Sequence, residues 1–233
     1  MWICIVFIAL GAIALVFYLL EKCNNYSLKG VLLKSIVSLL FLATALAAAF
    51  QNGGHPLNIF IIAGLILGLL GDIWLDLKYV YPKDDKLYTY AGFAVFGVGH
   101  ILYITGMMLE FFQDGSMLYF LIPIGGAAVF AIANLFLSKP MKLDFKDLKW
   151  VVTAYAFLLA SNPATALMLC IHTSWQQPAL IMLLVGGVLF AISDLVLSNT
   201  YFGEDHEKPI DFILNYLTYY GAQFVIAFSL FFL

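Results

Sequence analysis

The stretch "LNIFIIAGLILGLLGDIWLDLK" at residues 57–78 decides the fold, because it is almost uninterrupted apolar sequence. Crossing a lipid bilayer as a helix takes about 20 mostly apolar residues, and this stretch is long enough. The whole chain has 233 residues, of which 64% are hydrophobic and 11% are charged. A soluble domain is about 45–50% apolar and about 25% charged. The sequence therefore predicts an integral membrane protein.

Similar apolar stretches recur along the rest of the chain. They predict eight spanning helices, at 2–20, 29–50, 57–78, 88–112, 117–137, 149–171, 178–200 and 210–232. The connections are short, so we expect an all-α bundle in which residues 1–233 form a single transmembrane domain. The first stretch lacks a basic leading segment and is long enough to span. We therefore interpret it as the first helix and not as a cleaved signal peptide.

The lysines are segregated, and the chain contains no arginine. All lysines lie in or beside the first, third, fifth and seventh connections of this arrangement: Lys22, Lys29, Lys34, Lys78, Lys83, Lys86, Lys139, Lys142, Lys146, Lys149 and Lys208. The positive-inside rule places those connections in the cytoplasm and both termini outside. An odd number of helices would mix the lysines between the two sides. Size and economy favour a bacterial inner membrane as the location.

A short internal repeat accompanies this arrangement. The sequence "GDIWLDL" at 71–77 resembles "SDLVLSN" at 193–199, so Asp72 and Asp194 occupy equivalent positions. Each lies near the cytoplasmic end of a helix that runs inward. The repeat suggests that the two halves of the chain are parallel four-helix repeats.

Several ionisable residues lie inside the expected spans, where a charge at helix centre costs about 2.5–3.5 kcal/mol. They are Lys34, Asp72, Asp76, His100 and Asp194. In the last expected helix, Tyr219, Tyr220 and Gln223 lie at comparable depth. Pairing recovers part of the desolvation cost, so we expect these side chains to meet in one polar pocket in the lysine-rich half of the membrane.

Each of these residues also has a structural interpretation. Asp76 lies close to the interface, where it could be solvated or could pair with Lys78. Lys34 could extend its ammonium group to the headgroups. His100 could be a packing device between helices, and the two tyrosines could be core aromatics. Asp72 and Asp194 could form a purely structural ion pair with Lys34.

The sequence "ASNPATA" at 160–166 adds small polar groups near mid-membrane. Pro163 removes a helix hydrogen bond, and Ser161 and Asn162 can satisfy the freed carbonyl. This segment predicts either a kink that widens a cavity or ordinary helix packing. Asn134 in the expected fifth helix is open to the same two interpretations.

Five motifs together resemble the YhhN family, which includes the animal lysoplasmalogenases. They are "LLKSIVSLLFL" with Lys34, "GLLGDIWLD" with Asp72, "FAVFGVGHILYI" with His100, "GGVLFAISDLVLS" with Asp194 and "YYGAQFVIAFSL" with Tyr219, Tyr220 and Gln223. The resemblance covers most of the chain. It implies hydrolysis of the vinyl ether of lysoplasmalogens to a fatty aldehyde and a glycerophospho-base. It also implies that Asp72 and Asp194 are the catalytic pair, and it implies no cofactor.

Vinyl ethers resist base and yield to acid, since protonation of the outer alkene carbon gives an oxocarbenium ion to which water adds. Two carboxyl groups in a low-dielectric pocket can divide the work, one as the proton donor and one as the negative charge beside the cation. The sequence does not say which aspartate takes which role. Lys34 would hold one carboxylate ionised or bind the lipid phosphate. We expect His100 and the tyrosines, with Gln223, Asp76 and Asn162, to orient water or substrate.

Other classes of function remain open or are disfavoured. A zinc hydrolase would need at least three protein ligands, for which His100, Asp72 and Asp194 are an unusual set. A proton-coupled transporter or a lipid-binding membrane protein could use the same buried polar cluster, but a transporter should have polar residues through both halves of the membrane. The scattered Cys4, Cys23 and Cys170 predict no disulfide framework. No basic patch suits nucleic acid and no GxSxG motif is present, so the expected partners are a lysophospholipid substrate and bilayer lipids.

Overall fold

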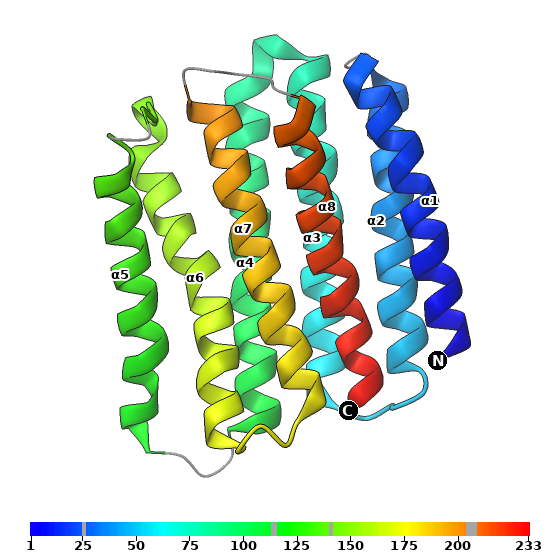
Figure 1. The fold of residues 1–233 in the computed structure, drawn as a ribbon, viewed down its shortest axis with the longest axis vertical. Coiled ribbons are helices and arrows are strands. Elements are labelled where there is room, and N and C mark those ends of the chain that lie inside the picture. The colour runs from blue at the N-terminus through cyan, green and yellow to red at the C-terminus, as the bar shows by residue number, and fades with distance from the viewer. Residues whose placement is uncertain (25–26, 113–115, 140–141, 204–208) are drawn as a thin grey trace.

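A computed structural model describes the chain except for residues 25–26, 113–115, 140–141 and 204–208 (Figure 1). The described residues are helical with no strand. The α-helices are α1 (Trp2–Asn24), α2 (Leu28–Ala49), α3 (Pro56–Val80), α4 (Asp85–Phe111), α5 (Leu121–Leu137), α6 (Lys149–His172), α7 (Pro178–Phe202) and α8 (Pro209–Ser229). Short 3₁₀ helices lie at Pro82–Asp84, Met117–Phe120, Lys146–Leu148 and Leu230–Phe232. The all-α expectation is confirmed.

The helix starts follow local chemistry. Ser27 caps α2 by accepting a hydrogen bond from the backbone N–H of Gly30, at 3.2 Å. Pro56 and Pro178 stand at the first position of α3 and α7, where proline removes no helical hydrogen bond. In the described chain, six helices are long and apolar enough to cross a membrane, namely α1 to α4, α6 and α7. The apolar part of α5 is shorter, and α8 carries the polar sequence "NYLTYYGAQ" that contributes to the site.

Successive helices pack against one another within α1 to α4 and within α5 to α8, and α1 and α5 lie at opposite ends of the bundle (Figure 1). Contacts between distant parts of the chain join α2 to α8 and α4 to α6. These two pairs are equivalent if α1 to α4 and α5 to α8 are related halves. The contact pattern is therefore the one that the four-helix repeat requires, although the repeat itself stays a prediction.

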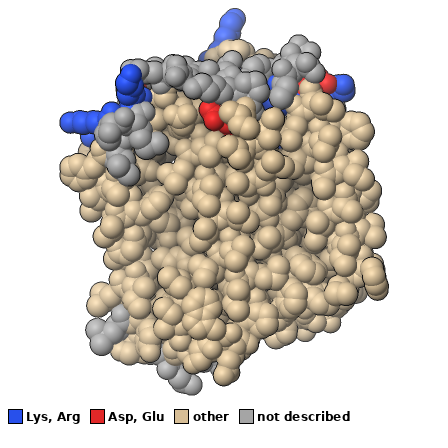
Figure 2. Space-filling view, viewed as in Figure 1, with Lys and Arg blue, Asp and Glu red and all other residues tan. Residues whose placement is uncertain are grey.

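The outer surface is apolar over most of its height. Large hydrophobic side chains are exposed along the helices, for example Ile13, Ile59, Val129 and Val188. In Figure 2 the lysines visible on this face gather at one end of the molecule, above a wide uncharged band. The two chain ends lie together at the opposite end (Figure 1). This surface fits a lipid bilayer, as the composition predicts.

One close approach positions the region around Asp72. A Cβ atom on Gly71 of α3 would come within 2.5 Å of the Phe96 ring of α4. Only glycine therefore allows this ring to lie against the α3 backbone. The ring in turn packs edge-to-face against Tyr219 of α8, with 6.0 Å between the centroids. The glycine thus brings three helices together next to the carboxyl group.

Candidate active site

Asp72 of α3 is surrounded by donors from two other helices. Its Oδ2 atom accepts hydrogen bonds from the hydroxyls of Ser38, at 2.6 Å, and Tyr219, at 3.0 Å. Its Oδ1 atom lies 3.4 Å from Lys34 Nζ. The carboxyl group is buried, at 2% exposure. A cation and two hydroxyl donors stabilise a carboxylate that is buried from bulk solvent.

A buried network of charges extends from Asp72 toward α1. Lys34 Nζ also lies 3.3 Å from Asp76 Oδ1, and Lys22 Nζ lies 3.1 Å from the same atom. The hydroxyl of Tyr18 donates to Asp76 Oδ2 at 2.9 Å. Two lysines and two aspartates therefore alternate through the core. Each is shared or paired, as buried charges require.

This network excludes two of the structural interpretations that the sequence left open. Asp76 is neither solvated nor paired with Lys78, since it is buried between Lys22 and Lys34. Lys34 does not extend to the headgroups, because its ammonium group lies between two carboxylates. Lys22 lies in the last turn of α1, beside the first connection as the sequence predicts, and it is buried. A helix predicted from its apolar sequence ends at the first charged residues. Here the charged residues belong to the helices and are buried in the protein interior.

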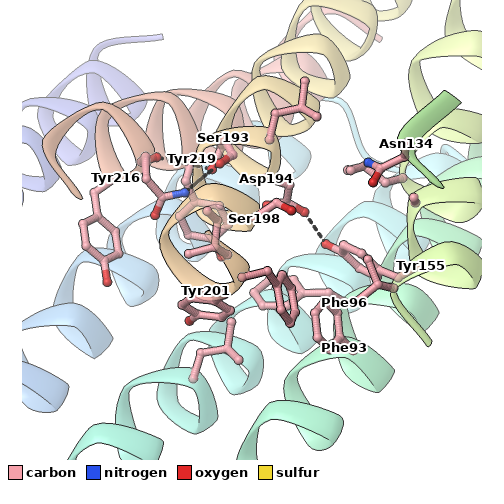
Figure 3. A pocket seen from close by; sticks show the side chains of 18 of the residues that line it. Phe93, Phe96, Asn134, Tyr155, Ser193, Asp194, Ser198, Tyr201, Tyr216 and Tyr219 are labelled. Carbon is pink, nitrogen blue, oxygen red and sulfur yellow. Dashed lines mark hydrogen bonds between the residues drawn. The ribbon is translucent and has the colours of Figure 1, made fainter. Parts of the chain in front are cut away.

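Asp194 of α7 has different surroundings. Its Oδ2 atom accepts a hydrogen bond from the hydroxyl of Tyr155 of α6, at 2.6 Å (Figure 3). Among the described residues, no lysine or histidine nitrogen lies within 4.0 Å of its oxygens. The residue is partly exposed. Asp194 thus has one neutral donor, whereas Asp72 has a cation and two hydroxyl donors.

Both aspartates line a single pocket, shown in part in Figure 3. The volume open to the centres of water molecules is about 70 Å³. Because one water needs about 10–15 Å³ by this measure, the pocket has room for several. Apolar side chains form most of the remaining wall: Leu75, Phe93, Phe96, Phe130, Val152, Leu159, Leu195, Leu197 and Phe202. The two carboxyl groups therefore share a largely apolar cavity with space for water.

Hydrogen bonds between α7 and α8 fix the positions of these two helices relative to each other. Asn215 of α8 donates from Nδ2 to the backbone carbonyl of Ser193, at 2.8 Å. The hydroxyl of Ser193 donates back to the carbonyl of Asn215, at 3.3 Å. Ser193 precedes Asp194, and Tyr219 lies one turn after Asn215. These hydrogen bonds therefore hold α7, which carries Asp194, in a fixed position relative to Tyr219, which donates to Asp72.

The polar residues of α8 lie on the side of Asp72. Gln223 Nε2 donates to the Tyr219 hydroxyl at 2.9 Å, which directs the tyrosine proton to Asp72. The Tyr220 hydroxyl lies 3.4 Å from both the Ser38 hydroxyl and the backbone carbonyl of Lys34. Of these α8 residues, only Tyr219 lines the pocket. Gln223 and Tyr220 support its wall from behind.

His100 of α4 lies outside the pocket wall. Its Nδ1 atom is 3.1 Å from Asn162 Nδ2, and its ring packs against Phe190 with 4.9 Å between centroids. It is buried, and its Nε2 atom has no partner among the described residues. This placement fits the packing interpretation better than direct contact with substrate. Asn162 therefore contacts His100 and not the pocket, and Pro163 packs against Gly187 of α7.

Sequence reasoning missed four residues that bind the aspartates directly: Tyr18, Lys22, Ser38 and Tyr155. Ser38 lies one helical turn after Lys34, so a search of the Lys34 helix face would have found it. Tyr155 has no comparable signal, because tyrosines are frequent in this chain. Asn134, left open by the sequence, lies in the pocket wall.

We expect Tyr155→Phe to lower turnover about tenfold while leaving the protein folded, because one hydrogen bond to a charged or reacting group is worth about 1.5–3 kcal/mol. The ring stays in place against Phe93, at 5.1 Å between centroids, so only the hydroxyl is lost. Product formation at saturating substrate measures the effect. Tyr88→Phe, outside the pocket wall, is the matched control. Unchanged turnover in Tyr155→Phe would show that the contact with Asp194 has no role.

The zinc alternative needs His100, Asp72 and Asp194 to converge. In the described part of the chain, no group of three or more histidine, cysteine, aspartate or glutamate side chains is arranged to hold a metal ion. His100 turns to Asn162, and Asp72 is occupied by Lys34 and two hydroxyls. The proposed ligand set therefore does not form in this structure.

Comparison with known proteins gives one result. No curated protein and no solved structure matches the chain. The sequence profile of the YhhN family matches residues 30–230, a region that contains Lys34, both pocket aspartates and the polar residues of α8. The match covers most of the chain, and this protein therefore belongs to the YhhN family.

Proposed function

We propose that this protein is a membrane-embedded hydrolase of lysophospholipids that cleaves the vinyl ether bond of lysoplasmalogens. The observation that carries the proposal is that Asp72 and Asp194 line one apolar pocket with unlike partners. Acid-catalysed cleavage of a vinyl ether needs a proton donor and a separate negative charge. Family membership adds support, because the YhhN resemblance implies this reaction and this pair.

The surroundings favour one division of roles. Asp72 lies beside Lys34 and accepts two hydroxyl hydrogen bonds, so its carboxylate is the better stabilised anion. Asp194 has no cation within 4.0 Å among the described residues and accepts only from Tyr155. A carboxyl group in a largely apolar pocket without a counter-charge is better suited to carry the proton. We therefore assign the proton donor to Asp194 and the charge that faces the cation to Asp72.

The reaction then follows in balanced steps. Asp194 gives its proton to the outer alkene carbon, which leaves an oxocarbenium ion stabilised by the Asp72 carboxylate. A water molecule in the pocket adds to the cation and returns a proton to Asp194. The resulting hemiacetal collapses to a fatty aldehyde and the glycerol hydroxyl. The pair resembles that of glycoside hydrolases, which also stabilise an oxocarbenium-like state with carboxyl groups.

The pocket also suits the apolar part of the substrate. Aromatic and aliphatic side chains from α4 to α7 line the side beyond Asp194, including Phe93, Phe130, Val152 and Leu195. Leu195 and neighbouring residues of α7 are exposed on the outer surface, toward the bilayer. An alkenyl chain can therefore lie among these side chains while the vinyl ether faces the two carboxyl groups.

A proton-coupled transporter is the second candidate, because a buried network of two lysines and two aspartates also suits proton movement. Transport needs polar groups that continue to the opposite end of the bundle. At that end, His55 pairs with Glu110 at 2.7 Å, and both side chains are partly exposed near the helix ends. The polar groups thus gather on one side, which favours a one-sided pocket.

The direct test is to incubate the purified protein with a lysoplasmalogen and to measure free fatty aldehyde. We expect aldehyde and glycerophospho-base in equal amounts. The matched lipid with an alkyl ether, which lacks the double bond, should not be cleaved because it cannot form the oxocarbenium ion by protonation. Proton-driven uptake into proteoliposomes without any aldehyde would instead support transport and overturn the proposal.

A further inference from the structure

Lys78, near the end of α3, is a cation held beside the pocket without a carboxylate partner among the described residues. Its Nζ atom lies 3.2 Å from the centroid of the Tyr201 ring and 4.9 Å from that of Tyr79. Tyr201 is itself part of the pocket wall (Figure 3). The lysine is partly buried. An aromatic side chain thus fixes a positive charge at the edge of the cavity.

The neighbouring charges leave this cation in surplus. Lys22 and Lys34 are matched by Asp72 and Asp76 through direct ion pairs. Lys78 adds a third lysine to the same region without a third carboxylate in contact. Asp85, at the start of α4, is exposed. Among the described residues, Lys78 is therefore left without a contacting carboxylate and is available to an anionic ligand.

We infer that Lys78 binds the phosphate group of the lysophospholipid substrate. The inference rests on the proposed function for the position of the chain. A phosphodiester carries a single negative charge, which matches the single surplus lysine. Lysine is a common phosphate ligand that acts as a point charge.

The position of Lys78 agrees with the length of such a lipid. It lies six residues after Asp72, which is about 9 Å along a helix axis at 1.5 Å per residue. The seven bonds from the outer alkene carbon, through the ether oxygen and the glycerol, to the phosphorus span a comparable length when extended. The phosphate would also lie at the lysine-rich end of the molecule, where headgroups gather (Figure 2). A charge-assisted hydrogen bond to phosphate is stronger than a cation–π contact, so Lys78 can exchange its ring partner for the ligand.

The test measures binding with lipids that the protein cannot cleave, so it does not depend on turnover. The two probes are a 1-O-alkyl glycerophosphocholine and the 1-O-alkylglycerol of the same chain length, titrated into the purified full-length protein. We expect Lys78→Gln to weaken binding of the phospholipid about tenfold or more, and to leave binding of the uncharged lipid unchanged. Lys78→Arg should keep most of the affinity.

Lys86→Gln is the matched control, because Lys86 lies at the same end of the bundle but is exposed and pairs with Asp147 at 3.1 Å. It should bind both lipids as the wild type does. Equal losses for the two lipids in Lys78→Gln, or no loss for either, would overturn the inference. Selective loss for the phospholipid in a protein that releases no aldehyde from lysoplasmalogen would keep the phosphate site and reject the proposed reaction.

Discussion

Asp194→Asn is expected to abolish aldehyde release from lysoplasmalogen, with turnover lowered at least about 10²- to 10⁴-fold, the usual contribution of a general acid. Asparagine has nearly the same shape and can still accept the Tyr155 hydrogen bond through its amide oxygen. It cannot supply the proton that starts the cleavage. Folding should be retained, because Asp194 has no ion pair to lose among the described residues. Product release by the purified variant, together with its elution volume and thermal unfolding, measures both expectations.

Asp72→Asn separates the two proposed roles. It should also abolish turnover, because an amide does not stabilise a neighbouring cation as a carboxylate does. Unlike Asp194→Asn, it should also disturb the buried network, since Lys34 then has only Asp76 as a counter-charge. Binding of an alkyl ether analogue should survive in Asp194→Asn. Wild-type turnover in either variant would remove that aspartate from the mechanism.

The helices could be predicted because their signal is independent of tertiary structure. A run of about 20 apolar residues is enough to mark a span, and the expected boundaries agree with those of α1 to α8 to within four residues. The depth of a residue in the membrane can also be predicted, by counting residues from the end of its helix. It brought Asp72 and Asp194 to the same level, and the structure places both on one pocket.

Direction around a helix axis could not be predicted in the same way. His100 has a suitable depth, but its side chain turns to Asn162 and not to the pocket. Tyr155 was overlooked although its hydroxyl contacts Asp194, because no feature separates it from other tyrosines in apolar sequence. Lys22 and Asp76 were assigned to the helix ends on the basis of charge alone. Their mutual contact, together with the contacts of Lys34 and Tyr18 with Asp76, explains why they are buried.

The unequal surroundings of the two aspartates arise from the lysines and not from depth. Asp72 and Asp194 occupy equivalent positions in the short repeat, but only α2 supplies a lysine to its aspartate. At the corresponding place α6 supplies Tyr155. If the two halves are duplicates in which a tyrosine stands in place of the lysine, the two carboxyl groups occupy similar positions but differ in their preferred charge state. Lys34 is therefore the residue on which the division of roles depends.

Lys34→Met should destabilise the protein more than any other single change in the network, by about 3–5 kcal/mol, the usual cost of removing one partner from a buried ion pair. The ammonium group contacts both Asp72 and Asp76, and Lys34 is 4% exposed. Methionine fills a similar volume, so the loss is one of charge and not of packing. Unfolding in mixed micelles, titrated with a denaturing detergent, measures the difference in free energy.

A second change distinguishes charge imbalance from a general defect. Lys34→Met with Asp72→Asn removes one charge of each sign and leaves the pair of Lys22 and Asp76 intact, at 3.1 Å. This double variant should regain most of the lost stability while remaining inactive. Lys29→Met is the control on the same helix, because its side chain is 72% exposed and pairs with Glu21, so it should cost less than about 1 kcal/mol. If the double variant is no more stable than Lys34→Met, the lysine acts through packing, and the assignment of Asp72 as the stabilised carboxylate loses its basis.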